Sequence, residues 1–284
     1  MTQSRLHFAR GRFLGRYQAR RRVGALDLAE IEPTVPEHEV ELHTHEDAHL
    51  LLLLGGTYLS SARGMPDAFR GTALLLNPPG TTHRDRFRGL DGRFFTLSVS
   101  AGAWRALAGS RRLPDHALRL GPAALVRACR LRRELGAWDG ASPLAVESEL
   151  EELLDEVSSA ERLGTGGGPA WLERARERLQ DGWEEAPSIA ELARAAGVHP
   201  VSLARAFRRR YGCSPGSYLR RCRLERAIEL LAAGEATLTE VAARCGYADH
   251  AHFTHAFRRA FSLAPSAFRP LSRVSPVQAA GRGS

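Results

Sequence analysis

The sequence contains no lysine, so all 40 of its Lys or Arg positions are arginine. Together with 32 acidic residues, these arginines give a formal net charge of +8 at pH 7. A basic protein favours a polyanionic partner, and arginine can bind a phosphate group through two hydrogen bonds. A GC-rich genome would also favour arginine codons and would explain the missing lysine. The charge therefore supports nucleic-acid binding only weakly.

Cysteine and long apolar runs are also scarce. The four cysteines, Cys129, Cys213, Cys222 and Cys245, include no CxxC pair and no spacing typical of disulfides, so we expect buried, reduced thiols. The longest apolar run, Leu50–Leu54, is too short to cross a bilayer, and the Arg-rich N-terminus lacks the apolar segment of a signal peptide. We therefore expect a cytoplasmic protein with no membrane partner.

The chain is longer than one compact core usually needs, and its pattern of apolar residues changes near Ala101. Before that point, Gly and Pro clusters separate short apolar or alternating runs, which predicts the strands of a β-sandwich or barrel. The expected strands are Ala25–Ile31, His49–Leu54, Thr57–Ser61, Ala73–Leu76 and Phe94–Val99. After that point, apolar residues recur at helical spacing.

Two amphipathic helices of opposite charge are expected between residues 101 and 163. The first carries Arg127 and Arg130, and the second carries Glu149 and Glu152 among other acidic residues. Opposite charges favour packing of the two helices, within one chain or between subunits, and solvated charged faces are an equal alternative. The Gly-rich segment 164–169 that follows is typical of a flexible linker.

Beyond this linker the sequence contains an internal repeat. Ser188 with Glu191, and Thr237 with Glu240, each match a capping box, in which side chains bond the free amides of a helix's first turn. The segments that follow correspond in order, Leu192–Val198 to Val241–Tyr247 and Ala206–Arg209 to Ala256–Arg259. Each copy has a helix, a Gly-containing turn and a second helix, which predicts two helix-turn-helix units.

The second helix of each unit has an apolar pair four residues apart, Leu203 with Phe207 and Phe253 with Phe257. This spacing predicts a buried inner face and an outer face that is free for a ligand. The connector Tyr218–Leu231 is expected to be a helix about 20–27 Å long. Such a helix could place two recognition helices in successive major grooves, about 34 Å apart, so that one chain reads two adjacent sites.

The run from Ser188 to Arg269 resembles the DNA-binding domain of the AraC/XylS family of transcription regulators. The matching residues are spread through both units and include Ala193, Gly197, Leu203, Arg205, Phe207, Gly212, Pro215, Tyr218, Arg223, Leu224, Ala227, Leu230, Leu231, Ala242, Gly246, Phe253, Phe257, Pro265 and Arg269.

This resemblance implies that exposed positions of both recognition helices contact bases. The implied positions are Val201, Ala204 and Arg205 in the first helix and His250, Ala251, Thr254 and His255 in the second. Arg205 is the leading candidate, because arginine can bond guanine O6 and N7 together. Phosphate contacts are expected from Arg208, Arg209, Arg258 and Arg259, for which a solvated helix face is the alternative.

Three positions depart from the family pattern. His199 stands where a capping serine is usual, and His255 stands where arginine is usual. Ser262 replaces the glycine that normally ends the second recognition helix. We therefore expect the first unit to supply most of the base reading and the second to contribute mainly backbone contacts.

The N-terminal part resembles the cupin jelly-roll barrel, which is common in AraC-type regulators. His43-Thr44-His45 with His49 matches the first cupin motif, and Pro78–His83 matches the second. The resemblance implies a possible four-imidazole site, formed by His43, His45, His49 and His83, which would suit Zn, Ni, Cu or Fe. The first three share strand parity, so one continuous strand would direct them to one face, with His83 on the facing strand.

Other features of the two motifs leave an alternative open. His49 occupies the position of an acidic ligand, Glu37 replaces an opening glycine and Phe87 a closing asparagine. Many regulatory cupins have lost the metal and bind a small organic effector in the barrel instead. The nearby carboxylates are expected to be solvated or to orient the ligands; they are Glu41, Glu46, Asp47 and Asp85.

The sequence thus predicts a multidomain β plus α protein. The expected parts are a cupin-like sensor at 1–100, a helical dimerisation or coupling region at 101–163, the linker at 164–169, a double helix-turn-helix domain at 170–271 and a disordered tail at 272–284. We expect a DNA-binding transcription regulator and not an enzyme, which responds to a small molecule or a metal.

Its expected partners are promoter DNA, RNA polymerase and a second copy of the chain in a homodimer, and binding to DNA would place it in the bacterial nucleoid. Two other functions stay open at this point. One is a metal-dependent cupin oxygenase or isomerase with a DNA-binding appendage. The other is an architectural DNA binder with a degenerate sensor.

Overall fold

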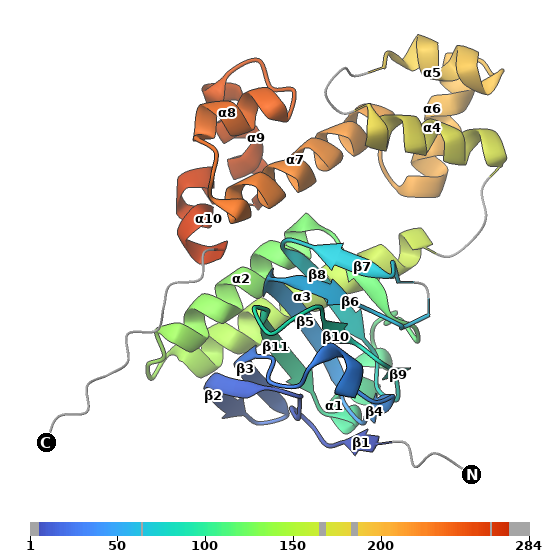
Figure 1. The fold of residues 1–284 in the computed structure, drawn as a ribbon. Helices are drawn as coiled ribbons and strands as arrows, with labels where there is room; N and C mark the ends of the chain where they lie inside the picture. The colour runs from blue at the N-terminus through green and yellow to red at the C-terminus, as the bar shows by residue number, and fades with distance from the viewer. Residues whose placement is uncertain (1–5, 64, 165–168, 183–186, 262, 273–284) are drawn as a thin grey trace, which may run out of the picture. The chain divides into compact units, whose positions relative to one another are not determined.

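The computed structural model describes residues 6–63, 65–164, 169–182, 187–261 and 263–272 (Figure 1). Ser262, residues 165–168 of the predicted linker and residues 273–284 of the predicted tail lie outside the described residues. The chain forms two compact units, an N-terminal one that contains the described strands and residues 124–154, and a C-terminal one that consists mainly of residues 155–269. No described helix is both long enough and apolar enough to cross a membrane.

The N-terminal unit is built from short strands arranged in three hydrogen-bonded sheets. The strands are β1 (Leu6–Phe8), β2 (Arg16–Val23), β3 (Leu26–Glu32), β4 (His43–His45), β5 (Ala48–Gly55), β6 (Thr57–Leu59), β7 (Ala68–Arg70), β8 (Ala73–Asn77), β9 (Thr82–His83), β10 (Arg86–Phe87), β11 (Arg93–Val99) and β12 (Leu118–Leu120). The largest sheet has the order β12-β8-β5-β11-β3-β2, and the smaller ones have the orders β1-β4-β9 and β10-β6-β7. The predicted β-rich N-terminal domain is therefore confirmed, whereas closure into a jelly-roll barrel stays a prediction.

The large sheet is apolar at its centre and charged at one edge. Residues Ala48–Leu53 of β5 are all buried, as expected for a continuous apolar run in a central strand. The edge strand β2 carries Arg20 and Arg22, which each donate to the Asp27 carboxylate of β3 at 2.7 Å. Asp27 is fully buried, so these two bonds satisfy a charge that water does not reach.

Three helices complete this part of the chain: α1 (Ala101–Ala108), α2 (Pro122–Gly136) and α3 (Ser142–Gly164). Arg127 and Arg130 of α2 lie 3.2 Å and 3.3 Å from the Glu149 carboxylate of α3. The two oppositely charged helices therefore pair within one chain, which decides between the alternatives left by the sequence. Arg132 of α2 donates to Glu30 of β3 at 2.9 Å, so the helix is also tied to the large sheet.

The C-terminal unit is entirely helical in its described part, which confirms the second half of the predicted fold class. Its helices are α4 (Ala170–Asp181), α5 (Ile189–Ala196), α6 (Pro200–Tyr211), α7 (Pro215–Ala233), α8 (Leu238–Arg244), α9 (His250–Phe261) and α10 (Pro265–Ser272). The predicted connector lies within α7, which begins with Pro215 in its first turn and ends before Gly234, whose φ is +76°.

Both predicted capping boxes are present, and they begin the first helix of each helix-turn-helix unit. The Ser188 amide donates to the Glu191 carboxylate at 2.8 Å, and the Thr237 amide donates to the Glu240 carboxylate at 2.7 Å. The turns that follow use Gly197 at φ +66° and Gly246 at φ +69°, a conformation that suits glycine because it has no Cβ. In both units, therefore, a capping box begins the first helix and a glycine in the left-handed conformation follows its end.

In each helix-turn-helix unit a small core packs against the inner face of the second helix. Leu203 and Phe207 of α6, like Phe253 and Phe257 of α9, have no exposed surface. The Phe257 ring centroid lies 4.6 Å from that of Phe261. The predicted apolar pairs are therefore the centres of two small cores, and the opposite faces of α6 and α9 are left to solvent.

These cores make a direct prediction about stability. Phe257→Ala should lower the free energy of opening of α8, α9 and α10 by about 3–5 kcal/mol, because it removes a buried ring and leaves a cavity. Amide hydrogen exchange in the full chain measures this opening locally. The adjacent exposed substitution Arg258→Ala should change it by less than about 0.5 kcal/mol. Equal effects of the two substitutions would show that α9 does not organise this core.

Candidate DNA-binding helices and buried histidine cluster

The outer faces of α6 and α9 carry the residues predicted to contact bases. Val201 and Arg205 on α6 are exposed, as are His250, Ala251 and His255 on α9. Ala204 and Thr254 are half-buried at the edges of these faces. The structure therefore places all the predicted positions on the sides turned away from the cores. That they contact DNA bases stays a prediction.

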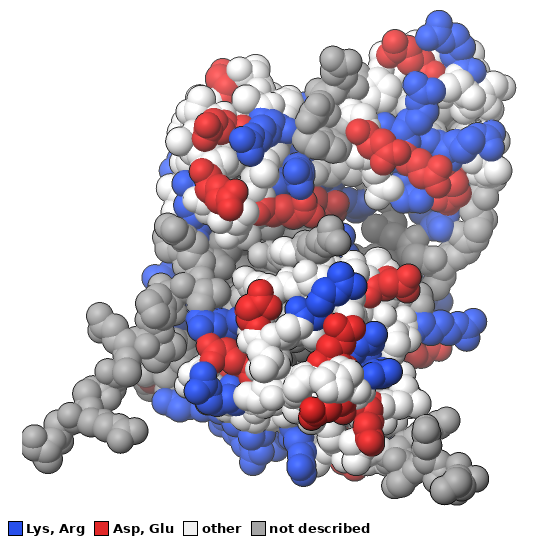
Figure 2. Space-filling view, viewed as in Figure 1, with Lys and Arg blue, Asp and Glu red and all other residues white. Residues whose placement is uncertain are grey.

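The predicted phosphate contacts are exposed in the C-terminal halves of the same helices; they are Arg208, Arg209, Arg258 and Arg259. Arginine and acidic side chains are mixed on the face shown in Figure 2, which has no continuous basic surface. On this face, charge alone therefore does not single out a surface for DNA.

Two side chains fix the beginnings of the recognition helices. His199, which departs from the family pattern, still caps α6, since the Val201 amide donates to its Nδ1 at 3.3 Å. Asp249 caps α9 by accepting from the His252 amide at 2.7 Å. Our sequence analysis did not single out Asp249, although an Asp just before a helix is a recognisable capping signal.

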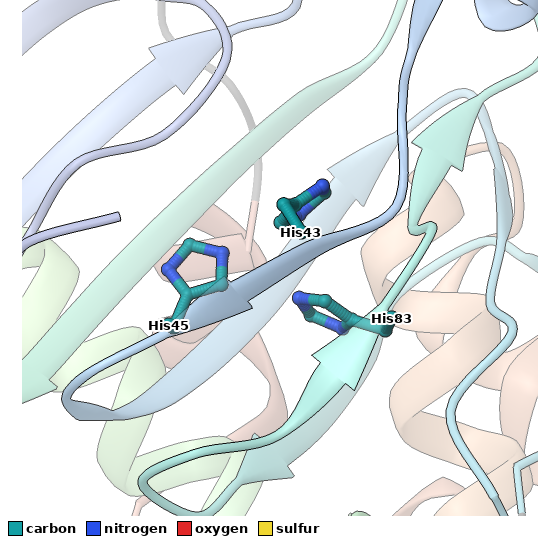
Figure 3. A group of neighbouring side chains, drawn as sticks. All are labelled: His43, His45 and His83. Carbon is teal, nitrogen blue, oxygen red and sulfur yellow. The ribbon is translucent and has the colours of Figure 1, made fainter. Parts of the chain in front are cut away.

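A cluster of buried imidazoles lies in the N-terminal unit. His43 and His45 lie on β4, and His83 lies on the adjacent antiparallel strand β9, directly opposite His43 (Figure 3). The ring centroids of His43 and His83 are 4.8 Å apart, and those of His45 and His49 are 4.3 Å apart. All four side chains are buried.

The predicted strand geometry of this cluster is wrong in two respects. The chain bends at Glu46 and Asp47, so His49 lies on β5 in a different sheet and not on one continuous strand with His43 and His45. His83 lies on a hydrogen-bonded neighbour of β4 and not on a facing strand. The bend nevertheless brings the His49 ring back against His45.

The four imidazoles form two overlapping sets of ligand atoms and not one. Nitrogen atoms of His43, His45 and His83 lie within 4.8 Å of one another, and so do atoms of His45, Asp47 and His49. Each set is buried and could hold a metal ion. Asp47, which the sequence analysis placed among solvated or orienting carboxylates, is thus a third candidate ligand of the second set.

Neighbouring groups orient the first set. The Nδ1 atom of His83 lies 2.8 Å from the Asp85 carboxylate, which also accepts hydrogen bonds from Tyr58 and Ser60. The Nδ1 atom of His43 lies 2.8 Å from the backbone carbonyl of Glu41. Metal-binding histidines usually have one ring nitrogen held in this way by a carboxylate or carbonyl. The other nitrogen of each ring is then left for a ligand.

Burial favours the neutral, metal-binding form of His43, His45 and His49. Loss of solvation lowers the pKa of His43 and His45, and it lowers the pKa of His49 to about 3. His45 Nδ1 and His83 Nε2 are buried without a hydrogen-bond partner among the described residues. A buried polar atom without a partner is costly unless something absent from the described residues satisfies it. The residues therefore fit a metal ion or a polar ligand group.

The four histidines line a pocket whose other walls are mainly apolar. Besides the histidines, Asp85 and Arg86, the pocket is lined by Phe8, Phe13, Leu14, Pro33, Val35, Val40, Leu51, Tyr58, Phe87 and Phe94. The Phe8 ring stacks on His43 with 4.8 Å between centroids, and Phe13 lies 5.0 Å from His45. Sequence reasoning missed both phenylalanines, because no local pattern connects them to the histidines.

The lowered pKa values predict acid sensitivity of the metal-free protein. The unfolded chain takes up protons on its histidines below about pH 6.5, whereas His43, His45 and His49 stay neutral in the folded state. The folded state therefore loses stability as the pH falls below about 6.5, by up to about 1.4 kcal/mol per pH unit for each ring, and for His49 this loss continues toward pH 3. Thermal unfolding of the chelator-treated chain at pH 7.5, 6.5 and 5.5 measures this slope.

Two variants isolate the histidine contribution from that of Asp47, whose carboxyl pKa burial raises. His49→Gln should flatten the slope. His38→Gln should leave it unchanged, because the His38 side chain is 82% exposed. An unchanged slope in His49→Gln would contradict the prediction.

Comparison with known proteins connects these features to a family. A family described as a helix-turn-helix domain matches residues 192–270. The chain is 28% identical to the HTH-type transcriptional activator RhaS of Salmonella arizonae over 264 residues, which cover 84% of this chain and 91% of the relative. RhaS of Escherichia coli O139:H28 is 26% identical over 255 residues, with the same coverage of both chains.

Among solved structures, an AraC-type regulator of Chromobacterium violaceum is 27% identical and covers 36% of this chain and 91% of its own, with a TM-score of 0.35. The match to RhaS, in contrast, runs through both units, including the β-sheet domain that precedes the helices. These matches support an AraC/XylS-type helix-turn-helix transcription regulator, a DNA-binding protein and not an enzyme, which is similar to RhaS along most of its length.

Proposed function

We propose that this regulator reads its operator mainly with α6 and responds to a ligand bound in the pocket beside the histidine cluster. The observation that carries the proposal is the division of α6 into a fully buried inner face and an exposed face that presents Arg205. A ligand changes DNA binding only if its affinity differs between the DNA-competent and DNA-incompetent arrangements of the chain.

In this proposal the two recognition helices have unequal roles. Arg205 binds a guanine, with Val201 and Ala204 beside it on α6. The corresponding region of α9 presents His250, Ala251, Thr254 and His255, which have shorter reach or weaker charge than arginine. Phosphate contacts from Arg208, Arg209, Arg258 and Arg259 position both helices without selecting a sequence.

Arg205→Ala should remove discrimination at one G·C pair and weaken binding to the operator by about 5- to 150-fold, which corresponds to about 1–3 kcal/mol. The measurement is fluorescence anisotropy with a duplex that the full chain selects from a random pool. Arg259→Ala is the matched control: it should weaken binding to all duplexes alike and reduce the dependence on salt by about one counterion. Unchanged affinity and specificity in Arg205→Ala would refute this role.

The pocket offers two kinds of site to an effector. Its phenylalanine, leucine and valine walls suit an apolar part of a small organic molecule. His43, His45 and His83 would hold a Zn, Ni, Cu or Fe ion, and His45, Asp47 and His49 form the second set. When bound, such an ion would supply positive charge and coordination bonds beside the histidines of the pocket.

The division of the chain into three regions is consistent with coupling between the sensor and the DNA-binding domain. We take residues 1–100 as the cupin-like sensor, 101–163 as the dimerisation or coupling region and 170–271 as the DNA-binding domain. The bond between Arg132 of α2 and Glu30 of β3 supports this coupling, because it ties a helix of the middle region to a strand beside the sensor core. RNA polymerase and a second copy of the chain are the expected protein partners.

A zinc titration tests the metal alternative. Chelator-treated full chain should bind about one Zn²⁺ and unfold at a higher temperature once loaded, since an ion that binds only the folded state stabilises it. His45→Ala should abolish both effects, because His45 belongs to both sets of ligand atoms. His116→Ala should not, because the His116 side chain is 53% exposed and belongs to neither set. Absence of zinc binding would leave the pocket to a purely organic effector.

A further inference from the structure

One apolar side chain on the DNA-reading face is not explained by the fold. Val201 is 51% exposed, and no other large apolar side chain of α6 or of the described part of α9 is comparably exposed. Its backbone amide bonds the His199 ring, but its side chain contributes to neither helix-turn-helix core. A valine at this position therefore adds nothing to the stability of α6, and a residue with higher helix propensity would make the helix more stable.

Val201 sits in the first turn of α6, directly after the Pro200 that begins the helix. In helix-turn-helix proteins the N-terminal residues of the recognition helix lie closest to the base edges. The only apolar group that any base presents in the major groove is the C5-methyl group of thymine. A valine has no hydrogen-bonding atom, so this methyl group is the one base feature that it can favour.

On these grounds, and resting on the proposed reading of DNA by α6, we infer that Val201 selects a thymine through its C5-methyl group. The β-branched side chain supports this role, because in a helix it is held in essentially one rotamer and presents its methyl groups in a fixed direction. Contact between the two apolar groups removes both from water, which is worth about fourfold in affinity for each methyl-sized group buried.

The position of Arg205 sets where this thymine lies. Arg205 follows Val201 by one helical turn on the same exposed face, about 6 Å along the helix axis. Base pairs in DNA are spaced about 3.4 Å apart. The selected thymine should therefore lie about two base pairs from the guanine that Arg205 binds.

Comparison of the two repeats indicates that thymine selection is confined to one half of the operator. Leu203 and Phe207 of α6 correspond to Phe253 and Phe257 of α9, which places Ala251 at the position equivalent to Val201. Alanine is shorter by two methyl groups and reaches less far into a groove. Methyl recognition should therefore occur in the half-site bound by α6, and its location fixes the direction in which the chain lies on DNA.

Replacement of single thymines by deoxyuridine tests the inference, because it removes the methyl group and leaves base pairing unchanged. The probe is the duplex selected by the full chain, with each thymine replaced in turn. We expect one position, near the guanine sensed by Arg205, to lose about three- to tenfold in affinity for the wild-type protein. Val201→Ala should weaken binding to the thymine duplex by a similar factor and be indifferent to deoxyuridine at that position.

One matched control is Val201→Thr, which keeps the β-branch and one methyl group and should retain part of the discrimination. The other is Leu144→Ala, which removes an exposed apolar side chain outside both recognition helices and should leave the discrimination intact. Additive effects of Val201→Ala and deoxyuridine, or no sensitive thymine at all, would overturn the inference. Failure of the full chain to select any duplex would instead overturn the proposed function. Loss of fold does not confuse the result, because Val201 is exposed and the thymine and deoxyuridine duplexes are compared on the same variant.

Discussion

Each recognition helix must bury two side chains four residues apart, and this requirement decides which of its other side chains can reach DNA. With Leu203 and Phe207 fixed inward, the helical period leaves Val201 and Arg205 outward. The same requirement in α9 turns His255 outward. Capping boxes and left-handed glycines then fix where the preceding helix begins and ends, so the recognition helix leaves the turn at a defined angle. The proposed base reading by Val201 and Arg205 thus depends on apolar packing on the opposite side of the helix.

The N-terminal unit solves a different problem, since it buries polar rings beside apolar ones. Imidazoles removed from water need partners, and the structure supplies Asp85 to His83, the Glu41 carbonyl to His43 and Asn77 to His49. Phe8 and Phe13 cover the rings from the side of the N-terminal segment. Some ring nitrogens still have no partner among the described residues, and this is the physical basis for expecting a ligand there.

How much the sequence predicts follows from how local each feature is. The capping boxes, the turn glycines and the apolar pairs of α6 and α9 depend on residues a few positions apart, and all of them are where the sequence places them. The histidine cluster depends on how strands meet, so its residues were found by motif while its geometry was wrong at the bend before His49. Asp47 and Phe8 join the site through contacts between strands, which have no periodic signal in the sequence.

The separation between the inner and outer faces of α6 and α9 also bears on how such regulators diverge. Because the cores are closed by Phe207 and Phe257, an exposed position can change without a large loss of stability. The two copies in this chain differ in this way: Arg205 in one corresponds to His255 in the other, although both helices keep the same buried pattern. A duplicated unit with this design can acquire a new operator by substitutions on one helix face, while the other copy continues to hold the chain on DNA.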